Sequence, residues 1–579
     1  MASSSYSTLP KEGEMAEQSM VQGVETKGVG FAPILRSYYE RCRIAQIIDE
    51  HVPLDPRRKP LTHGEASVAM ITGILFQVMQ LYRFVQFASE TTVLEVVYPH
   101  VKPEEYFDDR LADTLDALFK YGLGNLETLI TQHMIREFNI VTNTCHNDTT
   151  SASVYGHCDN NKTAESIRIT FGHSKKHRQD LKQLVWSLSV SSDSGFPLFQ
   201  KAYSGNTADV TTYVEQWQNL IDLLGRKDFL YVADSKLLTK ENMAHIHDND
   251  GFFIAPAPMY ESYKSAFHAA LGSHPAETLL PYKKQINRAF EVPFHVEHDE
   301  KTYPFRMIIL FDHGLFARKS NTLRNRIEKT KAAFKQLDEK LNKYNRKTEQ
   351  SIDQACSSIL RKYQTGDFFS YTIHNDPIIS LKNKKRGRVK ANEEAEKVAI
   401  IQDRFAVSLS FDESAFDKAL YHLGYYPLIT NKPFQDLTLH EAMMAHKNQY
   451  NCEHTNRRAK SGLNLEPIYL HTPERIEAFL FLFKIALQLL VLMERTARRN
   501  IEQRERGLDQ LMPNRNDVRN PKTESLLAAF KYVVQGRVLL HDGSVHGFIS
   551  QLTASQKDIL NILEVPSDYF TYKFLFDSS

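Results

Sequence analysis

The stretch from residue 141 to 258 constrains the fold most, because strand-like and helical patterns alternate within it. Apolar and β-branched residues predict four strands, at 166–170, 184–190, 197–202 and 229–233. Before the last of them, residues 212–224 repeat apolar side chains at helical spacing. Paired strands, a crossover helix and a further strand predict a mixed α/β sheet. Functional side chains are then expected at the strand ends.

Three carboxylates stand in sequence contexts that suit a metal site. Asp148 ends a polar run, and Asp234 directly follows the strand predicted at 229–233. Glu453 lies far downstream, on a helix predicted from residue 439 to 460. Carboxylates from separate elements can converge on two divalent cations, an arrangement used in metal-assisted phosphoryl transfer.

One face of the predicted helix 439–460 carries polar side chains at helical spacing, namely His446, Gln449, Glu453, Arg457 and Lys460. On one interpretation Glu453 binds a metal while Arg457 and Lys460 hold nucleic-acid phosphates. On the other, Glu453 and Arg457 form an ordinary i, i+4 ion pair worth about 0.3 kcal/mol.

Charge across the whole chain neither indicates nor excludes nucleic acid, since 71 Lys and Arg balance 70 Asp and Glu. Any basic surface must therefore be local. The segment 173–183 carries Lys175, Arg178 and Lys182, and the run 382–390 places six positive charges in nine residues. Both could neutralise phosphates, and both could be solvated loops.

The cysteines and the chain's apolar segments predict an intracellular protein with no membrane association. Five scattered cysteines without a CxxC pair argue against a disulfide scaffold. The polar N-terminus lacks the apolar stretch of a signal peptide. Residues 476–493 are strongly apolar, but Glu477, Lys484 and Gln488 interrupt them, which favours a helix buried in protein.

The patterns divide the chain into six segments. We predict a disordered tail at 1–28, an N-terminal helical domain and candidate DNA-binding domain at 29–140, the first part of the core at 141–258, an insertion at 259–405, the second part of the core with Glu453 at 406–510, and a C-terminal region at 511–579. The insertion contains a charged helix predicted from about residue 320 to 363. Its seven-residue apolar repeat fits either a coiled-coil hairpin arm or one helix packed on the body.

Several short runs, taken together, resemble the insertion-sequence DDE transposases, and more narrowly their IS four group. The runs are Asp148-Thr149-Thr150-Ser151, residues 172–183, 205–209 and 232–234, and later Cys452-Glu453, Arg457, Lys460-Ser461 and residues 473–477. The resemblance implies an α/β fold with an RNase H-like mixed-sheet core, an N-terminal helical domain and an α+β insertion that carries a long helical arm.

The resemblance also implies a chemistry and its partners. Asp148, Asp234 and Glu453 would be the catalytic residues and would bind two Mg²⁺ ions, for which Mn²⁺ could substitute. Water would attack a phosphodiester at the element's end, and the freed 3′-hydroxyl would attack target DNA. The expected partners are the terminal inverted repeats, target DNA and a second subunit in a homodimeric synaptic complex. The expected location is the prokaryotic cytoplasm, at the nucleoid when DNA is bound.

The third motif departs from the pattern of the group, which has Tyr and Arg where this chain has His446 and Gln449. Gln449 lacks the charge and the fork of Arg. The expected DNA contacts are Lys175, Arg178, Lys182, His446, Arg457 and Lys460. Two alternatives stay open: a catalytically inactive DNA-binding protein derived from a transposase, and an RNase H-like nuclease with another substrate.

Overall fold

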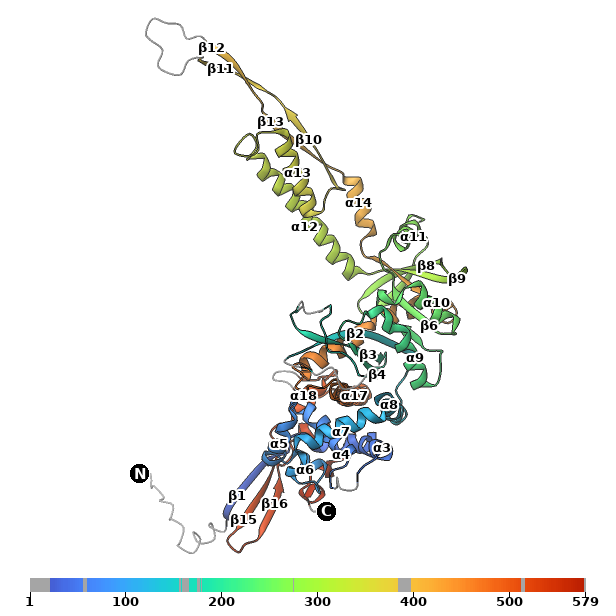
Figure 1. Cartoon of the computed structure of the whole chain (residues 1–579), viewed down its shortest axis with the longest axis vertical. Coiled ribbons are helices and arrows are strands. Elements are labelled where there is room, and N and C mark those ends of the chain that lie inside the picture. Colours follow the sequence, from blue (N-terminus) through green and yellow to red (C-terminus); the bar gives the residue numbers. More distant parts are fainter. Residues whose placement is uncertain are drawn as a thin grey trace, which may run out of the picture.

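The computed structural model describes residues 21–55, 60–155, 158, 166–173, 178, 180–273, 275–383, 397–511 and 516–576. The molecule is elongated (Figure 1). A helical body lies near both chain ends, a large sheet lies at the centre, and an arm extends away from the sheet.

A nine-stranded sheet forms the centre, in the order β4-β3-β2-β5-β6-β14-β9-β8-β7. Its first five strands are β4 (Pro197–Ser204), β3 (Lys182–Ser191), β2 (Thr144–Val154), β5 (Leu230–Val232) and β6 (Phe252–Pro256). The first three are antiparallel, while β5 and β6 run parallel to β2. Helix α9 (Tyr213–Leu224) crosses from β4 to β5. This is the topology of an RNase H-like core, so the predicted mixed α/β fold is confirmed.

Two strand predictions in this region need correction. Residues 166–170 contribute only an isolated bridge between Thr170 and Gln183. Conversely, Asp148 lies inside β2, which the polar sequence did not reveal as a strand. The polar side chains of β2 are nevertheless buried, because strands pair with it on both sides and helices cover the sheet.

Four further strands extend the sheet beyond β6, and they correct the boundaries predicted for the insertion. They are β7 (Thr278–Tyr282), β8 (Gln285–His298), β9 (Lys301–Phe311) and β14 (Tyr425–Thr430). Strand β14 pairs with β6 on one side and with β9 on the other. Residues 278–311 therefore belong to the sheet and not to the insertion, whereas residues 406–423 belong to the arm and not to the core.

The arm leaves the sheet after β9 and returns at β14. Because Phe311 pairs with Tyr425, its two ends are neighbours, and a long insertion there need not disturb the sheet. Its elements are helices α12 (His313–Asp338), α13 (Glu349–Tyr363) and α14 (Glu413–His422), with the strand pairs β10 (Phe369–Asn375) with β13 (Phe405–Phe411) and β11 (Ile378–Asn383) with β12 (Lys397–Gln402).

The helix predicted at 320–363 is two helices packed on each other. Phe334 and Leu337 of α12 share one buried cluster with Ile352 and Ala355 of α13. The break is set locally, because Thr348 caps α13 and starts a new helix. Of the two alternatives, the hairpin arm is therefore the one observed.

The helical body is built around α17 (Pro473–Glu502), which packs against the predicted N-terminal helices. These include α2 (Ala32–Cys42), α3 (Ile44–His51), α4 (His63–Leu75), α7 (Asp108–Tyr121) and α8 (Leu123–Phe138). In the described part of the chain, α17 alone is long and apolar enough to cross a membrane by length and composition. However, 94% of its most apolar window is buried inside the protein, as the charges in 476–493 predicted.

Residues 21–28 pair with a strand from the last fifty residues of the chain in a small sheet. Strand β1 (Val21–Gly28) pairs with β15 (Val534–Leu540), which pairs with β16 (Val545–Ile549). The disordered tail predicted at 1–28 is therefore wrong for residues 21–28, while 1–20 lie outside the described residues. Local composition could not reveal this strand, because its partner lies at the other end of the chain.

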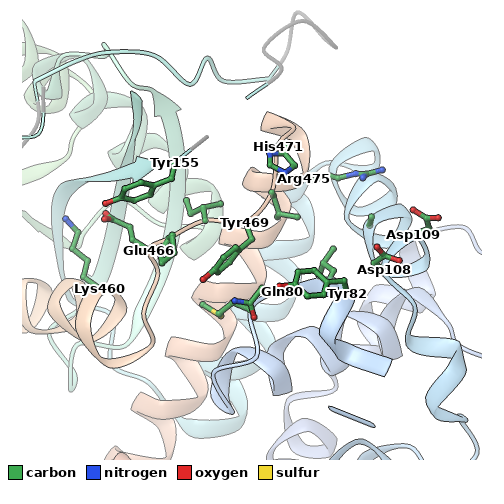
Figure 2. Close-up of a pocket in the computed structure, with 16 residues that line it drawn as sticks. Gln80, Tyr82, Asp108, Asp109, Tyr155, Lys460, Glu466, Tyr469, His471 and Arg475 are labelled. Atoms are coloured by element: carbon green, nitrogen blue, oxygen red, sulfur yellow. The ribbon is translucent and has the colours of Figure 1, made fainter. Parts of the chain in front are cut away.

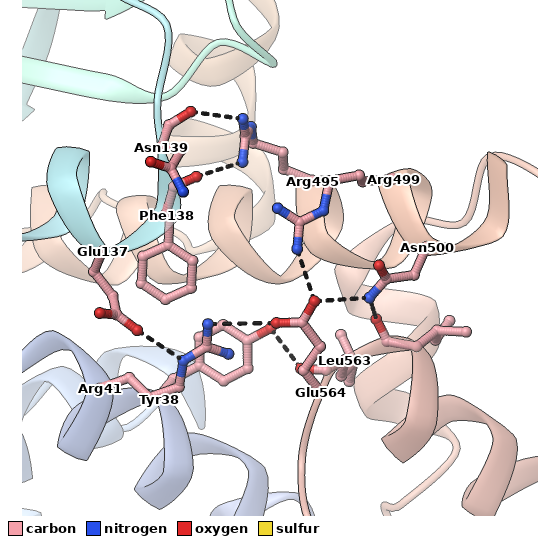
Figure 3. Close-up of polar contacts among 11 residues, drawn as sticks. Tyr38, Arg41, Glu137, Phe138, Asn139, Arg495, Arg499, Asn500, Leu563 and Glu564 are labelled. Carbon is pink, nitrogen blue, oxygen red and sulfur yellow. Dashed lines mark hydrogen bonds and ion pairs between the residues drawn. The ribbon is translucent and has the colours of Figure 1, made fainter. Parts of the chain in front are cut away.

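Ion pairs and a hydrogen bond to Glu564 join the C-terminal region to the helical body (Figure 3). Arg41 of α2 contacts Glu137 of α8 and Glu564, each at 3.4 Å. Arg499 of α17 donates to Glu564 at 2.7 Å, and Asn500 donates to the same oxygen at 3.1 Å. The predicted C-terminal region is thus part of the body.

Candidate active site

Asp148 lies on β2, and Asp234 lies two residues after the end of the neighbouring parallel strand β5. The register pairs His146 of β2 with Val232 of β5, and each aspartate lies two residues beyond its member of that pair. Alternate residues of a strand share a face, and neighbouring strands lie about 4.8 Å apart. The fold therefore places these two carboxylates side by side at the carboxyl end of β5.

The side chain of Lys236 lies close to both carboxylates. Its ammonium forms an ion pair with Asp209. That hydrogen bond is the largest cause of a raised Lys236 pKa, and the negative charges of Asp234 and Asp148 add to it. The charges of both aspartates therefore act on the same ammonium group, which agrees with their lying close together.

Two donors hold the carboxylate of Asp234 in place. The hydroxyl of Tyr213 donates to Oδ1 at 2.5 Å, and the backbone amide of Lys236 donates to the same oxygen at 2.9 Å. Burial raises the pKa of Tyr213 far above its usual value, so the hydroxyl keeps its proton and stays a donor. Oδ2 has no hydrogen bond from a described residue and is available to a further ligand.

Asp148 is held from the opposite side by helix α16 (Gln449–Arg457), which packs over β2 and β3. The amide of Asn456 donates to Asp148 Oδ2 at 3.0 Å. The side-chain oxygen Oδ1 of Asn456 is buried and accepts no hydrogen bond in the described part of the chain. A buried acceptor beside a carboxylate suits a cation, since hard cations such as Mg²⁺ bind oxygen ligands.

Glu453 lies on α16 one turn before Asn456, and its side chain is exposed. Residues three apart are neighbours on a helix surface, so Glu453 lies along the edge of α16 that faces Asp148. Among the described residues, however, no group of three or more His, Cys, Asp or Glu side chains lies close enough to hold a metal ion. The structure thus brings the two aspartates together and leaves Glu453 on the covering helix, outside a shared cluster.

The helix predicted from residue 439 to 460 is divided into three pieces. Helix α15 (Leu439–Lys447) ends before Asn448, α16 follows, and a π-helical turn spans Arg458–Gly462. The division has a packing cause: α15 covers the face of the sheet near β5 and β6, whereas α16 covers β2 and β3. His446, on α15, therefore does not share the face of Glu453 as the sequence predicted.

Gln449 and His146 connect α16 to the central strand. The Gln449 amide donates to the backbone carbonyl of Asn147 at 3.1 Å, and its oxygen lies 3.0 Å from Nδ1 of His146. An amide can donate and accept at once, which the guanidinium expected at this position cannot do. Gln449 thus fastens the helix to β2 instead of presenting a charge to DNA.

His446 is not a cation in this fold. Its ring lies 5.3 Å from that of Tyr426, and burial lowers its pKa to about 4. Burial likewise lowers the pKa of His146 to about 4. Both imidazoles are neutral near pH 7, so we do not retain His446 among the charged DNA contacts.

These two histidines predict that acid destabilises the fold. Between about pH 6.5 and 4 the unfolded chain binds protons at both positions while the folded chain does not, so stability falls as pH falls. The expected loss is about 1.4 kcal/mol per pH unit for each histidine. Denaturant unfolding at several pH values gives the free energy of unfolding as a function of pH. This free energy should fall less steeply with falling pH in His446→Phe than in the wild type, whereas the exposed-site control His374→Gln should match the wild type. Equal slopes for all three would contradict the assignment.

Four of the five other predicted DNA contacts belong to the described residues. Lys175 falls outside the described residues. Arg178 is engaged with Asp180 through two hydrogen bonds, at 2.8 and 2.7 Å. Lys182 begins β3, opposite Val154 of β2, and Arg457 is exposed at the end of α16.

Lys460 lines a cleft of about 800 Å³ between the core and the helical body. In Figure 2, Lys460, Tyr155 and Glu466 lie on the core side, and Tyr82 and Asp108 lie on the side of the helical body. None of the three candidate catalytic carboxylates lines this cleft. Lys460 therefore lies at the cleft between the core and the helical body, away from the three candidate carboxylates.

Sequence reasoning missed four residues that shape the site, namely Asp209, Tyr213, Lys236 and Asn456. Lys236 and Asn456 were detectable only as polar residues two and three positions from a candidate ligand. Tyr213 lies on a crossover helix whose orientation no local pattern gives. Its hydroxyl could be placed only once β5 and α9 were packed together.

Comparisons with known proteins identify a family for most of the chain. The family model described as the transposase DDE domain matches residues 147–489, and a domain of unknown function, DUF4277, matches residues 24–132. No curated protein sequence matches the chain.

Two solved structures of transposases are also similar to parts of the chain. One is a cryo-EM structure of a piggyBac transposase synaptic complex with hairpin DNA, at 8% identity and a TM-score of 0.25, covering 48% of this chain and 57% of the piggyBac chain. The other is a Mos1 transposase paired-end complex with the left transposon end, at 8% identity and a TM-score of 0.14, covering 38% and 67%. The chain thus spans little more than half the length of the piggyBac transposase.

The sheet has an RNase H-like strand order, with Asp148 on β2 and Asp234 just after β5. The transposase match covers more than half of the chain and includes Asp148, Asp234 and Glu453. The chain therefore belongs to the transposase DDE domain family.

Proposed function

We propose that the chain is a DNA transposase that cleaves the ends of its insertion sequence and joins them to target DNA by two-metal phosphoryl transfer. The observation that supports the proposal is that Asp148, on β2, and Asp234, just after the adjacent parallel strand β5, lie the same two residues beyond a paired position, inside the region that matches the family. Membership of the IS four group, expected from the motifs, is part of this proposal.

The residues present fit a magnesium site around the two aspartates. Asp148 and Asp234 would hold Mg²⁺, or Mn²⁺ in its place. Asn456 Oδ1 and Asp234 Oδ2, which accept no hydrogen bond from a described residue, favour a cation there. Glu453 would complete the set from α16. When bound, two such ions activate the attacking oxygen and stabilise the leaving oxygen.

The protein's own side chains position these ligands. Tyr213 and the Lys236 amide fix one oxygen of Asp234, and Asn456 fixes one oxygen of Asp148. Held carboxylates lose little freedom when they bind a ligand, which is the benefit of preorganisation. Lys236 offsets part of the negative charge that would otherwise accumulate before a cation binds.

The proposed reaction has two balanced steps. In the first, a water molecule gives up a proton as its oxygen bonds to phosphorus, the bond from phosphorus to the 3′ oxygen breaks, and that oxygen takes up one proton in return to give a 3′-hydroxyl. In the second, this hydroxyl loses its proton and attacks a target phosphodiester, which releases a target 3′-hydroxyl. One bond forms for each that breaks.

Terminal inverted repeats and target DNA are the proposed partners, bound by a homodimer in a synaptic complex. Arg457 and Lys460 lie on or just after the α16 helix that carries Glu453, and Lys182 begins a strand beside Asp148. Lysine and arginine side chains at these positions can contact DNA phosphates. Arg178 would first have to exchange its Asp180 contacts for DNA.

A specific observation favours one alternative, a catalytically inactive DNA-binding protein derived from a transposase. Gln449 is committed to β2, and Glu453 does not join the aspartates in one metal-binding group of described residues. Binding of terminal repeats without nicking in Mg²⁺ or Mn²⁺ would support it. An RNase H-like nuclease with another substrate would instead cleave without regard to the terminal sequence.

Glu453→Ala tests whether the third carboxylate takes part. We expect loss of end cleavage, measured on labelled duplex DNA, with DNA binding retained, because only a metal ligand would be removed from an exposed position. Glu502→Ala, a matched exposed glutamate at the end of α17, should cleave like the wild type. Full activity of Glu453→Ala would refute the proposed role of Glu453 and would leave the assignment of the two aspartates unchanged.

A further inference from the structure

The tip of the arm carries a two-stranded ribbon that lies far from the body (Figure 1). Strands β11 and β12 pair antiparallel, with Ile378 opposite Gln402 at the base and Asn383 opposite Lys397 at the tip. A two-stranded hairpin alone is marginally stable in water and needs a covering surface. All described side chains of β12 are exposed.

Both faces of the ribbon carry exposed apolar residues, and one face carries the more exposed set: Ile378, Val398 and Ile400, on the other face, are 42–47% exposed. Directly paired residues lie on the same face, so Ile379 with Ile401 and Leu381 with Ala399 form one surface. Ile379 and Ile401 are each 68% exposed, and Leu381 is 65% exposed. Clusters of this kind usually mark an interaction site.

We propose that this apolar face packs against the same face of a second copy of the chain, in an antiparallel, two-fold arrangement. Charge along β12 selects this geometry. The face reads Lys397 at the tip, Ala399 and Ile401 in the middle, and Asp403 just past the base. When two such faces meet antiparallel, Lys397 of each copy lies beside Asp403 of the other.

A second copy fits the face better than DNA does. Nucleic acid presents phosphates and polar base edges, which would leave Ile379, Leu381 and Ile401 without apolar partners. A two-fold contact is self-complementary, so one surface suffices for both subunits. The pairing rests on the proposed function for its purpose, because cutting two element ends uses two active sites.

The size of the face sets the strength of the contact. Stable protein interfaces bury about 1,200–2,000 Å² in total over both partners. One face of a pair of six-residue strands on each copy buries only a fraction of that area. The ribbon contact alone is therefore weak and concentration dependent. Such a contact can hold two copies together when DNA also links them, because linkage raises the effective concentration.

Site-specific cross-linking of the full-length chain tests the pairing without using catalysis. The five natural cysteines are buried, and the β12 side chains are exposed. A thiol introduced on β12 is therefore the one that the reagent reaches. The antiparallel register places Ala399 of one copy opposite Ile401 of the other. A mixture of Ala399→Cys and Ile401→Cys proteins, treated with a short bismaleimide, should give covalent dimers in greater yield than either alone. Val398→Cys, an adjacent exposed position on the opposite face, should give only background.

A charge exchange tests the register. Lys397→Asp and Asp403→Lys should each lower the yield of cross-linked dimer about two- to five-fold, as expected for an exposed ion pair. Both changes in one chain should restore it, because the pair is re-formed with its signs reversed. Failure of this rescue would overturn the antiparallel register.

Two outcomes would overturn the pairing itself. One is a dimer yield from the Ala399→Cys and Ile401→Cys mixture no greater than that from Val398→Cys. The other is duplex DNA shielding the Ile401→Cys thiol from alkylation while the chain stays monomeric, which would make the face a DNA contact. Absence of DNA cleavage would bear on the proposed function and would leave either result unchanged.

Discussion

Replacing Asp148 with alanine is expected to reduce end cleavage and strand transfer by at least about 10³-fold, a loss of about 4 kcal/mol of transition-state stabilisation. Asp148 lies on the central strand beside Asp234, where both carboxylates would hold the metal ions. Removal of one leaves the pair incomplete, so Asp234→Ala should have an effect of the same size. Gel separation of labelled cleavage and joining products measures both reactions.

DNA binding separates loss of chemistry from loss of folding in these variants. Both should bind end-bearing duplex with affinity near that of the wild type, since neither aspartate is proposed to contact phosphate. Asp222→Ala is the matched control, because it removes an exposed aspartate from α9, the helix that carries Tyr213. Cleavage at the wild-type rate by either site variant would refute its assignment.

Lys484→Met is expected to destabilise the protein by about 3–5 kcal/mol, because it leaves a buried carboxylate without its cation. Lys484 of α17 lies 3.3 Å from Glu127 of α8, and each side chain is 1% exposed. Glu127 also accepts a hydrogen bond from the backbone N–H of Gln200 in β4 at 2.7 Å. Burial raises the pKa of Glu127 and lowers that of Lys484, which reflects the cost of either charge alone. The thermal transition of the full chain should move to lower temperature.

A double variant distinguishes the lost ion pair from lost packing. Adding Glu127→Gln to Lys484→Met removes the uncompensated charge, and the neutral amide oxygen can still accept from Gln200. Most of the lost stability should return, since exchanging a whole buried pair for neutral groups costs far less than breaking it. A double variant as unstable as Lys484→Met would show that the charge is not the cause.

The pair of aspartates could be predicted from the sequence because its signals are local. A short apolar strand that ends in Asp234 and a polar run that contains Asp148 are both contiguous in the chain. Strand ends in an α/β sheet tend to meet at one edge. Paired strands and one crossover helix predict a mixed α/β sheet, the resemblance to the DDE transposases implies its RNase H-like form, and the structure confirms that fold.

Features that depend on distant partners could not be read from the sequence. Strand β14 becomes a sheet member only because β6 and β9 lie on either side of it. β1 is ordered by a strand near the opposite chain end. The division of the predicted helix at Asn448 follows from the two surfaces that α15 and α16 cover, a tertiary constraint that overrides local helix propensity.

The most direct test of the central claim incubates the full chain with duplex DNA that carries the inverted repeats flanking its own coding sequence. With Mg²⁺ or Mn²⁺, we expect a 3′-hydroxyl released at the repeat terminus and covalent joining to target DNA, with no product in EDTA or from Asp148→Ala. Binding of the repeats by the wild type without cleavage in either metal, or equal cleavage by Asp148→Ala, would contradict the account.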